Sequence, residues 1–158
     1  MCPSPMHDSS INVDTPIGPL CLYAADDHMT QLSWTHISEQ NITPFLQEAA
    51  NQLTAYFDGT LQAFDLPLAP AGTSFQKRVY QAMLDIPFGE TLQYGEIAKK
   101  LGTAAQPVGT ACGSNPIPII IPCHRVVSSI GLGGFSGLGG VDTKTKLLQL
   151  EKSLPTLF

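Results

Sequence analysis

The sequence predicts an α+β fold built from two modules, residues 1–72 and 73–158. Apolar residues alternate along the first part of the chain, which is typical of strands, whereas they recur at helical spacing from residue 73 onward. Prolines and glycine at 67–72 indicate a linker between the two patterns. A region with strands followed by a run of helices favours an α+β architecture.

The first module begins with a predicted β-hairpin. Its polar turn is Asp26-Asp27, and two antiparallel strands are expected within residues 17–36. The apolar positions that define these strands are Leu20, Leu22 and Ala24 before the turn and Met29, Leu32 and Trp34 after it.

A helix is expected after the hairpin. Thr43 suits the N-cap, Pro44 suits the first helical turn, and Gly59 marks the end. Apolar residues between them follow helical spacing, at Phe45, Leu46, Ala49, Leu53, Tyr56 and Phe57. We expect this helix to pack on the sheet, with a short strand around Phe64–Leu68 before the linker.

The second module is predicted to be mainly helical. One amphipathic helix begins at Thr73, a second covers 91–101, and a turn at 103–105 leads to a third over Gln106–Ser114. A helix, a short turn and another helix form the outline of a helix-turn-helix, which also occurs in proteins that never touch DNA. The last helix carries small residues at Gly109, Ala111 and Gly113. They would let it approach a DNA groove closely, although close packing inside the domain is the alternative.

The composition is that of a folded protein without a membrane span. Hydrophobic residues make up 43% and charged residues 13% of the chain, which is ordinary for a globular protein. The apolar run near Ile117–Ile121 is far shorter than the roughly 20 residues of a membrane helix. Residues 1–10 lack the basic and apolar parts of a secretory signal. We therefore predict a cytoplasmic protein with no membrane partner.

The four cysteines indicate reduced thiols. Cys2, Cys21, Cys112 and Cys123 form no CxxC pair and no regular disulfide framework. Cys2, Cys21 and His28 could meet at a metal, but three scattered ligands are a weak signal. We predict no metal and no cofactor.

Charge is distributed unevenly between the modules. Residues 1–72 contain eight acidic and no basic side chains, whereas residues 73–158 contain all eight basic and five acidic ones. The net charge of −5 therefore conceals a positively charged second module. Attraction to phosphate, if it occurs, belongs to that module, and an uneven surface with no such partner is the alternative.

The segment Asn115–Val127, NPIPIIIPCHRVV, is the most informative part of the chain. Its prolines restrict the backbone, so Cys123 is expected at a fixed position. A thiol needs positive or hydrogen-bonding neighbours to ionise at neutral pH, and His124 can accept its proton directly or through a water. Adjacent residues on a strand point to opposite faces, so their contact requires a turn or a water. A structural cysteine beside an ordinary histidine is the alternative.

The sequence Pro122-Cys123-His124-Arg125-Val126, with Asn115-Pro116 upstream, resembles the active-site signature of the O6-alkylguanine-DNA alkyltransferases, or methylated-DNA–protein-cysteine methyltransferases. The resemblance extends over most of the chain, through Thr15-Pro16-Ile17-Gly18, Tyr56-Phe57-Asp58-Gly59, Gly72-Thr73-Ser74-Phe75-Gln76, Phe88-Gly89-Glu90-Thr91, Tyr94-Gly95-Glu96-Ile97-Ala98, Val108-Gly109, Gly133-Gly134-Phe135-Ser136 and Leu147-Leu148-Gln149-Leu150-Glu151. It implies an N-terminal ribonuclease-H-like α/β domain and a mainly helical domain with a winged-helix-like helix-turn-helix.

The resemblance also implies catalytic roles. Cys123 matches the alkyl acceptor, His124 the water-linked base and Glu151 the carboxylate that orients the histidine. Asn115 matches the asparagine that braces the turn before the cysteine, and Tyr94 matches the tyrosine that rotates the damaged nucleotide and donates a proton toward the departing guanine.

Contacts with DNA and with the extruded base follow from the same resemblance. In this family the second helix of the motif enters the minor groove, and residues near the cysteine line the base pocket. The corresponding positions are Gln106, Val108, Gly109, Ala111, Gly113, Arg125, Val126, Phe135 and Ser136. The implied partner is double-stranded DNA containing O6-alkylguanine, bound by a monomer.

The chain departs from the family pattern in three places. Gln106 stands where an arginine usually fills the space left by the flipped base, so it lacks that cation and some reach. Pro107 replaces an alanine, and Phe135 replaces a tyrosine beside a glycine loop of different length. Weaker DNA binding or an altered lesion preference is the hypothesis that these changes suggest.

Three functions are compatible with the residues. The first is single-turnover repair, in which an alkyl group moves from O6-alkylguanine, or from O4-alkylthymine, to Cys123 after base flipping. The second is a non-catalytic protein that binds alkylated bases and flags damage, although that group lacks the cysteine. The third is another thiol enzyme such as a peptidase, whose cysteine and histidine normally come from distant segments. We predict the first.

Overall fold

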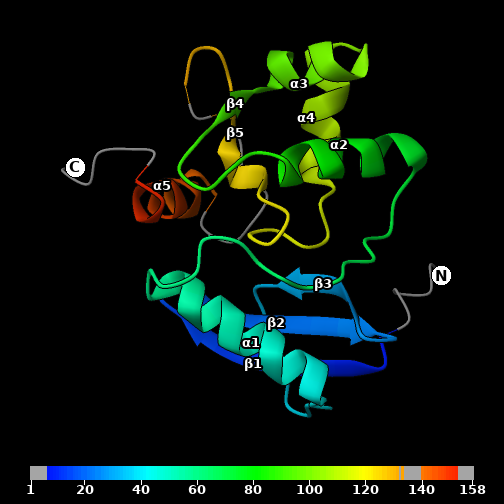
Figure 1. Ribbon diagram of the computed structural model, residues 1–158, viewed down its shortest axis with the longest axis vertical. Coiled ribbons are helices and arrows are strands. Elements are labelled where there is room, and N and C mark those ends of the chain that lie inside the picture. The colour runs from blue at the N-terminus through cyan, green and yellow to red at the C-terminus, as the bar shows by residue number, and fades with distance from the viewer. Residues whose placement is uncertain (1–6, 132, 134–139, 153–158) are drawn as a thin grey trace. The chain divides into compact units, whose positions relative to one another are not determined.

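The computed structural model describes residues 7–131, 133 and 140–152, and contacts divide the chain into the units Met1–Ala71 and Gly72–Phe158 (Figure 1). The first unit contains β1 (Ser9–Thr15), β2 (Gly18–Ala25), β3 (His28–Ser33) and α1 (Pro44–Phe57). The second contains α2 (Ser74–Leu84), β4 (Leu92–Gln93), α3 (Tyr94–Leu101), α4 (Ala105–Gly113), the 3₁₀ turn η1 (Cys123–Arg125), β5 (Val126–Val127) and α5 (Val141–Leu150). The predicted α+β fold class is confirmed.

The first unit is an antiparallel sheet in the order β1-β2-β3. The predicted hairpin is confirmed, because β2 and β3 pair around Asp26 and Asp27, whose φ angles of 50° and 56° suit a tight hairpin turn. Strand β1 was not predicted, although it pairs with β2 along its whole length. Its alternation is limited to Ile11 and Val13, which gives only a short apolar pattern.

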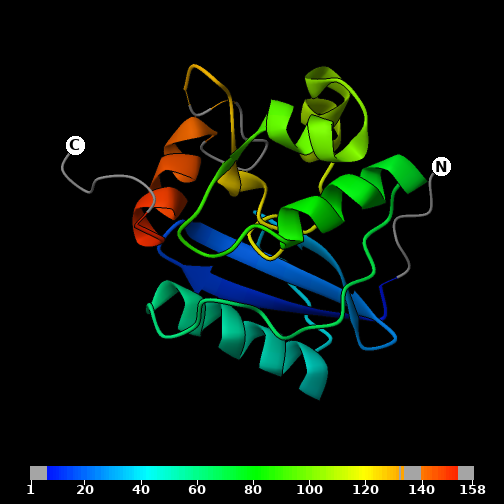
Figure 2. The same ribbon diagram turned by 45° about the horizontal axis from the view of Figure 1, so that its top comes forward.

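Helix α1 covers one face of this sheet (Figure 2). The predicted start is confirmed, because the Thr43 side chain accepts a hydrogen bond from the Leu46 amide at 3.2 Å and Pro44 opens the helix. The helix ends at Phe57, with Gly59 at φ 82° just beyond it. Its buried face consists of Leu46, Ala49, Ala50, Leu53 and Tyr56.

The strand predicted at Phe64–Leu68 is wrong. Only Leu68 takes part in pairing there, as an isolated parallel bridge to Met29. The Met29 amide donates to the Pro67 carbonyl at 2.9 Å and the Ala69 amide donates to the Met29 carbonyl at 2.8 Å. Pro67 itself has no N–H to donate, which limits how far such a ladder can extend.

The three predicted helices of the second unit are confirmed as α2, α3 and α4. Helix α2 begins with a capping box, in which Thr73 and Gln76 satisfy each other's backbone amides. Gly102, at φ 69°, ends α3 in the left-handed conformation that glycine adopts without strain. Helix α4 follows within three residues, so α3 and α4 form the expected helix-turn-helix.

The predicted start of the second helix at Thr91 is wrong by three residues. Leu92 and Gln93 form β4, which pairs in parallel with β5 at Val126 and Val127. Helix α3 therefore begins at Tyr94, where the Glu96 carboxylate accepts a hydrogen bond from the Gln93 amide at 2.9 Å. A two-residue strand leaves no periodic signal in the sequence, so only its partner reveals it. Among the described helices, none is long and apolar enough to cross a membrane.

Candidate active site

Cys123 opens a turn of 3₁₀ helix. The Arg125 amide donates to the Pro122 carbonyl at 3.0 Å, and the Cys123 amide donates to the Ile121 carbonyl at 2.8 Å. A 3₁₀ turn advances the side chains by about 120° per residue, so Cys123 and His124 are not held on opposite faces as they would be on a strand. The chain therefore makes the kind of turn that the Cys123 and His124 side chains would need in order to meet.

Asn115 braces the loop that leads to this turn. Its side-chain amide donates to the Ile121 carbonyl at 2.8 Å, and its side-chain oxygen accepts from the Ile117 amide at 3.0 Å. Within the braced loop Ile119 has φ 74°, a conformation that costs a β-branched residue energy. Asn115 is buried, so its two hydrogen bonds are shielded from water and help to hold the loop in this shape.

Cys123 is buried, with 6% of the residue exposed. Burial raises the pKa of Cys123, whereas the Asn115 side chain and the positive charge of Lys144 lower it. Burial dominates, so the thiol is protonated at neutral pH in the protein without substrate. Reaction at the sulfur therefore needs a group that removes this proton.

His124 and Arg125 share one buried carboxylate. The Glu151 Oε2 atom lies 2.7 Å from His124 Nε2 and 3.0 Å from an Arg125 guanidinium nitrogen. Its Oε1 atom accepts from Arg125 Nε at 2.8 Å, and Arg125 also donates to the Ile86 carbonyl at 2.7 Å. This network joins η1 to the end of α5 and fixes the imidazole in one orientation.

The network determines which nitrogen of His124 is free to accept a proton. Glu151 is held ionised by Arg125 and can only accept hydrogen bonds, so His124 Nε2 carries the hydrogen. Burial lowers the pKa of His124, against the opposing effect of Glu151, so the ring is neutral. Its Nδ1 is buried and has no hydrogen-bond partner among the described residues. Nδ1 is thus an available base.

Tyr94 reaches the site through the β4–β5 pairing, which the sequence did not reveal. The pair Leu92–Val126 brings the first residue of α3 beside the segment that follows Cys123. A Cβ atom at Gly133 would lie 2.9 Å from the Tyr94 ring, and one at Gly109 would lie 4.0 Å from it. Glycine at 133, with φ 75°, therefore allows the backbone to approach the ring as no other residue could.

Lys144 is the site residue that the sequence analysis missed. It lies on α5, its side chain is fully buried, and its ammonium group donates to the Val126 carbonyl at 2.6 Å. The same nitrogen lies 5.8 Å from the centre of the Tyr94 ring. A signal was available, since Lys144 shares the helical face of Leu147, Leu148 and Glu151 at spacings of three, four and seven.

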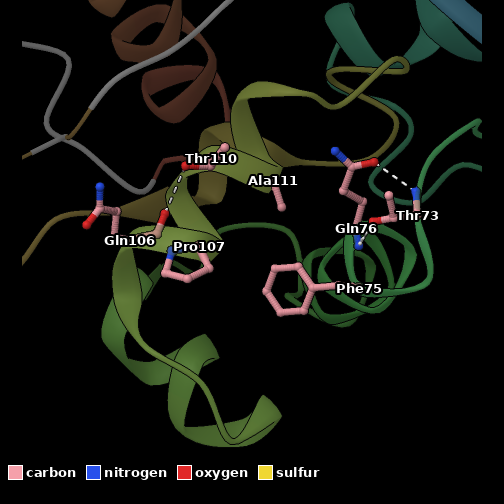
Figure 3. A pocket seen from close by; sticks show the side chains of 7 residues that line it. All are labelled: Thr73, Phe75, Gln76, Gln106, Pro107, Thr110 and Ala111. Carbon is pink, nitrogen blue, oxygen red and sulfur yellow. Dashed lines mark hydrogen bonds between the residues drawn. The ribbon is translucent and has the colours of Figure 1, made fainter.

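Helix α4 presents part of its surface beside a cleft. A cleft of about 410 Å³ separates it from the start of α2, and its lining contains no acidic residue (Figure 3). The lining residues are Thr73, Phe75, Gln76, Gln106, Pro107, Thr110 and Ala111. Figure 3 shows the Phe75 ring facing Pro107, whereas the amide end of Gln106 points away from them. Gln106 and Gly113 are exposed on the same helix.

Several residues expected to contact DNA are buried. Val108 and Val126 are fully buried, and Ala111 is 2% exposed. Arg125 is 7% exposed and its guanidinium binds Glu151 and the Ile86 carbonyl, so in this structure it supports His124 instead of facing DNA. Gly109 is half-buried against Tyr94. Phe135 and Ser136 lie outside the described residues.

No cluster of three or more metal-ligating side chains occurs within residues 7–131, 133 and 140–152. Cys21 is a buried free thiol in β2 and His28 is exposed at the start of β3. Cys2, the third residue considered for a metal, lies outside the described ranges.

Comparison with known proteins places this site in a family. A family model described as 6-O-methylguanine DNA methyltransferase, ribonuclease-like domain, matches residues 10–70, and one described as the DNA-binding domain of the same family matches residues 74–153. The chain belongs to the 6-O-methylguanine DNA methyltransferase family. Within this family it is similar to a Mycobacterium tuberculosis protein named methylated-DNA–protein-cysteine methyltransferase, with 46% identity over 89% of this chain and 90% of that protein. A protein of the same name from Methanosarcina acetivorans is 43% identical over 89% of this chain and 96% of its own length.

Solved structures of methyltransferases agree with these relatives. The crystal structure of the M. tuberculosis protein OGT in complex with DNA is similar with a TM-score of 0.81 and 46% identity, covering 91% of this chain and 92% of that one. An O6-methylguanine DNA methyltransferase from Methanococcus jannaschii has a TM-score of 0.66 and 29% identity, over 94% and 96% of the two chains. The family predicted from the Cys123 motif is therefore confirmed.

Proposed function

We propose that this protein repairs DNA by direct reversal, transferring a methyl or larger alkyl group from the O6 atom of guanine in duplex DNA to Cys123, once per molecule. The observation that carries the proposal is the neutral His124, held by Glu151 with its buried Nδ1 available as a base in the residue that follows the buried Cys123. Membership of the methyltransferase family supports the identity of the reaction.

The reaction begins with proton removal from the thiol. His124 Nδ1 takes the proton of Cys123, directly or through a water, and Glu151 stabilises the imidazolium that forms. The thiolate then attacks the alkyl carbon, the bond from that carbon to O6 breaks, and a thioether forms. The departing guanine takes a proton from the Tyr94 hydroxyl, and the proton that His124 took from the thiol then replaces it, so that the thiol proton is in effect passed to guanine. A thioether is stable, and a disulfide partner could not reverse it.

The base must leave the duplex before its O6 substituent can meet the sulfur. We infer that α4 enters the DNA groove, with Gln106 occupying the space left by the extruded nucleotide and Gly113 allowing close approach of the backbone. The cleft between α2 and α4 offers hydroxyl and amide groups without acidic side chains, which suits a neighbouring phosphate strand. The Val126 carbonyl, with Phe135 and Ser136, is assigned to the base pocket.

All proposed catalytic side chains come from one unit of one chain, which supports action as a monomer. The described cysteines, Cys21, Cys112 and Cys123, are free thiols, which supports a reducing compartment such as the cytoplasm. The damage-flagging alternative is not favoured, because Cys123 is present and lies next to a histidine that is held ready to act as a base.

The test is a transfer assay. The protein is incubated with a duplex oligonucleotide containing O6-methylguanine, and the added methyl is located by mass spectrometry. A single methyl on Cys123, with guanine restored in the DNA, supports the proposal. Cys123→Ser serves as the control, because it should bind the duplex without accepting a methyl. Tight binding of the lesion by the unmodified thiol would instead favour the damage-flagging function.

A further inference from the structure

Lys144 is a lysine whose burial the proposed reaction does not explain. Its side chain has no exposed surface, although lysine is among the residues least often buried completely. It lies on the inner face of α5 with Leu147 and Leu148. Burying an ammonium group costs free energy unless polar or charged neighbours compensate, so the neighbours of Lys144 indicate why it is there.

Those neighbours belong to the proposed reaction site. The Lys144 ammonium donates to the Val126 carbonyl at 2.6 Å and lies 5.8 Å from the centre of the Tyr94 ring. Val126 pairs with Leu92 across the β4–β5 ladder, and Tyr94 follows two residues after Leu92. One ammonium group therefore connects α5, the strand that follows Cys123, and the start of α3.

The other titratable groups around Cys123 are either balanced in charge or neutral. The positive charge of Arg125 is matched by Glu151, which it contacts through both carboxylate oxygens. Burial lowers the pKa of His124 and raises the pKa of Cys112 to about 12, so both groups are neutral at pH 7. Burial also raises the pKa of Tyr80, which is likewise uncharged.

We propose that Lys144 is a positioning residue of the alkyl-transfer site, which holds a positive charge near Cys123 and fixes the Val126 carbonyl and the Tyr94 ring where the extruded base must dock. The inference rests on the proposed function. Lys144 keeps its protons throughout, because the thiol proton goes to His124. The Lys144 charge stabilises the Cys123 thiolate before it attacks. Once the sulfur has become a neutral thioether, this stabilisation no longer acts.

The direction of two pKa shifts supports this role. Burial lowers the pKa of Lys144 to about 8, and the Cys123 charge opposes that shift. The Lys144 charge in turn lowers the pKa of Cys123 against the effect of burial. A carbonyl oxygen has two lone pairs, so Val126 can accept from Lys144 and still accept from an amino group of the base.

The first test compares Lys144→Met with Lys144→Arg and with Lys146→Met, an exposed lysine on the same helix. Transfer from an O6-methylguanine duplex is followed in single turnover between pH 6 and 10, and thiolate formation is followed by ultraviolet absorbance against Cys123→Ser. Lys144→Met should raise the pKa of Cys123 by about one unit, which lowers the transfer rate at pH 7 about tenfold. At high pH the rate of the variant should lie closer to that of the wild type. Lys144→Arg should restore most of the rate, and Lys146→Met should match the wild type.

A second test does not depend on the folding of Lys144→Met or on alkyl transfer. The side-chain carbon bonded to sulfur in ¹³C-labelled cysteine is titrated by NMR in the wild type and in Lys144→Arg. Arginine keeps its charge at the pH where Lys144, with a pKa of about 8, loses its own, so the pKa of Cys123 should be lower in Lys144→Arg.

The outcomes separate this proposal from the proposed function. If Lys144→Met slows transfer equally at every pH without changing the thiol pKa, the residue is only structural and the inference is overturned. An unchanged Cys123 titration in Lys144→Arg overturns it as well. If the wild type transfers no methyl, the proposed function fails, yet the thiol titrations still decide whether Lys144 acts on Cys123.

Discussion

His124 Nε2 and Glu151 Oε2 lie 2.7 Å apart and both side chains are completely buried. The carboxylate comes from the residue that ends α5, and the imidazole comes from a 3₁₀ turn 27 residues earlier. Arg125 binds the same carboxylate and keeps it ionised. The pair therefore gives a neutral imidazole a fixed tautomer, which is the requirement for a base at Cys123.

Replacing Glu151 by Gln should destabilise the fold and slow transfer. The side chain keeps its shape but loses the charge that balances Arg125, and breaking a buried ion pair costs about 3–5 kcal/mol of unfolding free energy. Urea unfolding measures the loss, and single-turnover transfer measures the rate. Glu90→Gln, an exposed control, should stay within about 0.5 kcal/mol of the wild type. Equal stability of the two variants would contradict the assigned pairing.

The stability of the protein should depend on the protonation of His124. Burial lowers the folded-state pKa of His124 below 6.5, so between these two pKa values the unfolded chain binds a proton that the folded chain does not. The neutral His124 contributes fully to the free energy of unfolding above pH 6.5, and this contribution is lost as the pH falls toward the folded-state pKa. Urea unfolding at a series of pH values should show a decline below pH 6.5 that is smaller in His124→Asn. The same decline in both proteins would refute this origin.

Removal of the Asn115 side chain should loosen the loop before Cys123. In Asn115→Ala the buried Ile117 amide loses its partner, at a cost of about 1–3 kcal/mol, whereas the Ile121 carbonyl loses one hydrogen bond and keeps the one from the Cys123 amide. We expect a fall of about 2 kcal/mol or more in unfolding free energy and a slower transfer. Asn51→Ala, on the exposed face of α1, is the matched control and should change neither measurement.

Replacing Gln106 by Arg should accelerate repair of duplex DNA. Gln106 is exposed near the start of α4, and arginine would add reach and a positive charge toward the phosphates and the vacated base position. The comparison is transfer from a duplex and from the single strand with the same lesion, since only the duplex requires a base to be displaced from the stack. An unchanged duplex rate, or an equal gain on the single strand, would contradict the role given to this residue.

Cys112 should resist thiol reagents in the folded protein. Burial raises its pKa to about 12, so at pH 8 only about one molecule in 10⁴ carries the thiolate at this position. Brief treatment with iodoacetamide followed by peptide mass spectrometry should leave Cys112 unmodified, whereas the same treatment in urea should alkylate it. Rapid labelling of Cys112 in the native protein would show that the thiol is more accessible or more acidic than its burial allows.

Local signals in the sequence were sufficient for most of the elements. Thr43-Pro44 marked a helix start by capping chemistry that depends on neighbouring residues alone. The Asp26-Asp27 turn marked the hairpin for the same reason. The errors fell where pairing with a distant segment decides the structure, as in β4 with β5 and the bridge from Met29 to Leu68.

The sequence by itself determined the family, the fold class and the identity of the proposed nucleophile, because these depend on motifs and spacing that each lie within a short stretch of chain. Tertiary structure alone decided that Arg125 supports Glu151 instead of facing outward, that His124 is left with Nδ1 as its available nitrogen, and that Lys144 lies beside Val126 and Tyr94. The physical reason is that protonation, burial and charge pairing depend on which groups meet in space, and those groups come from helices and turns separated by tens of residues.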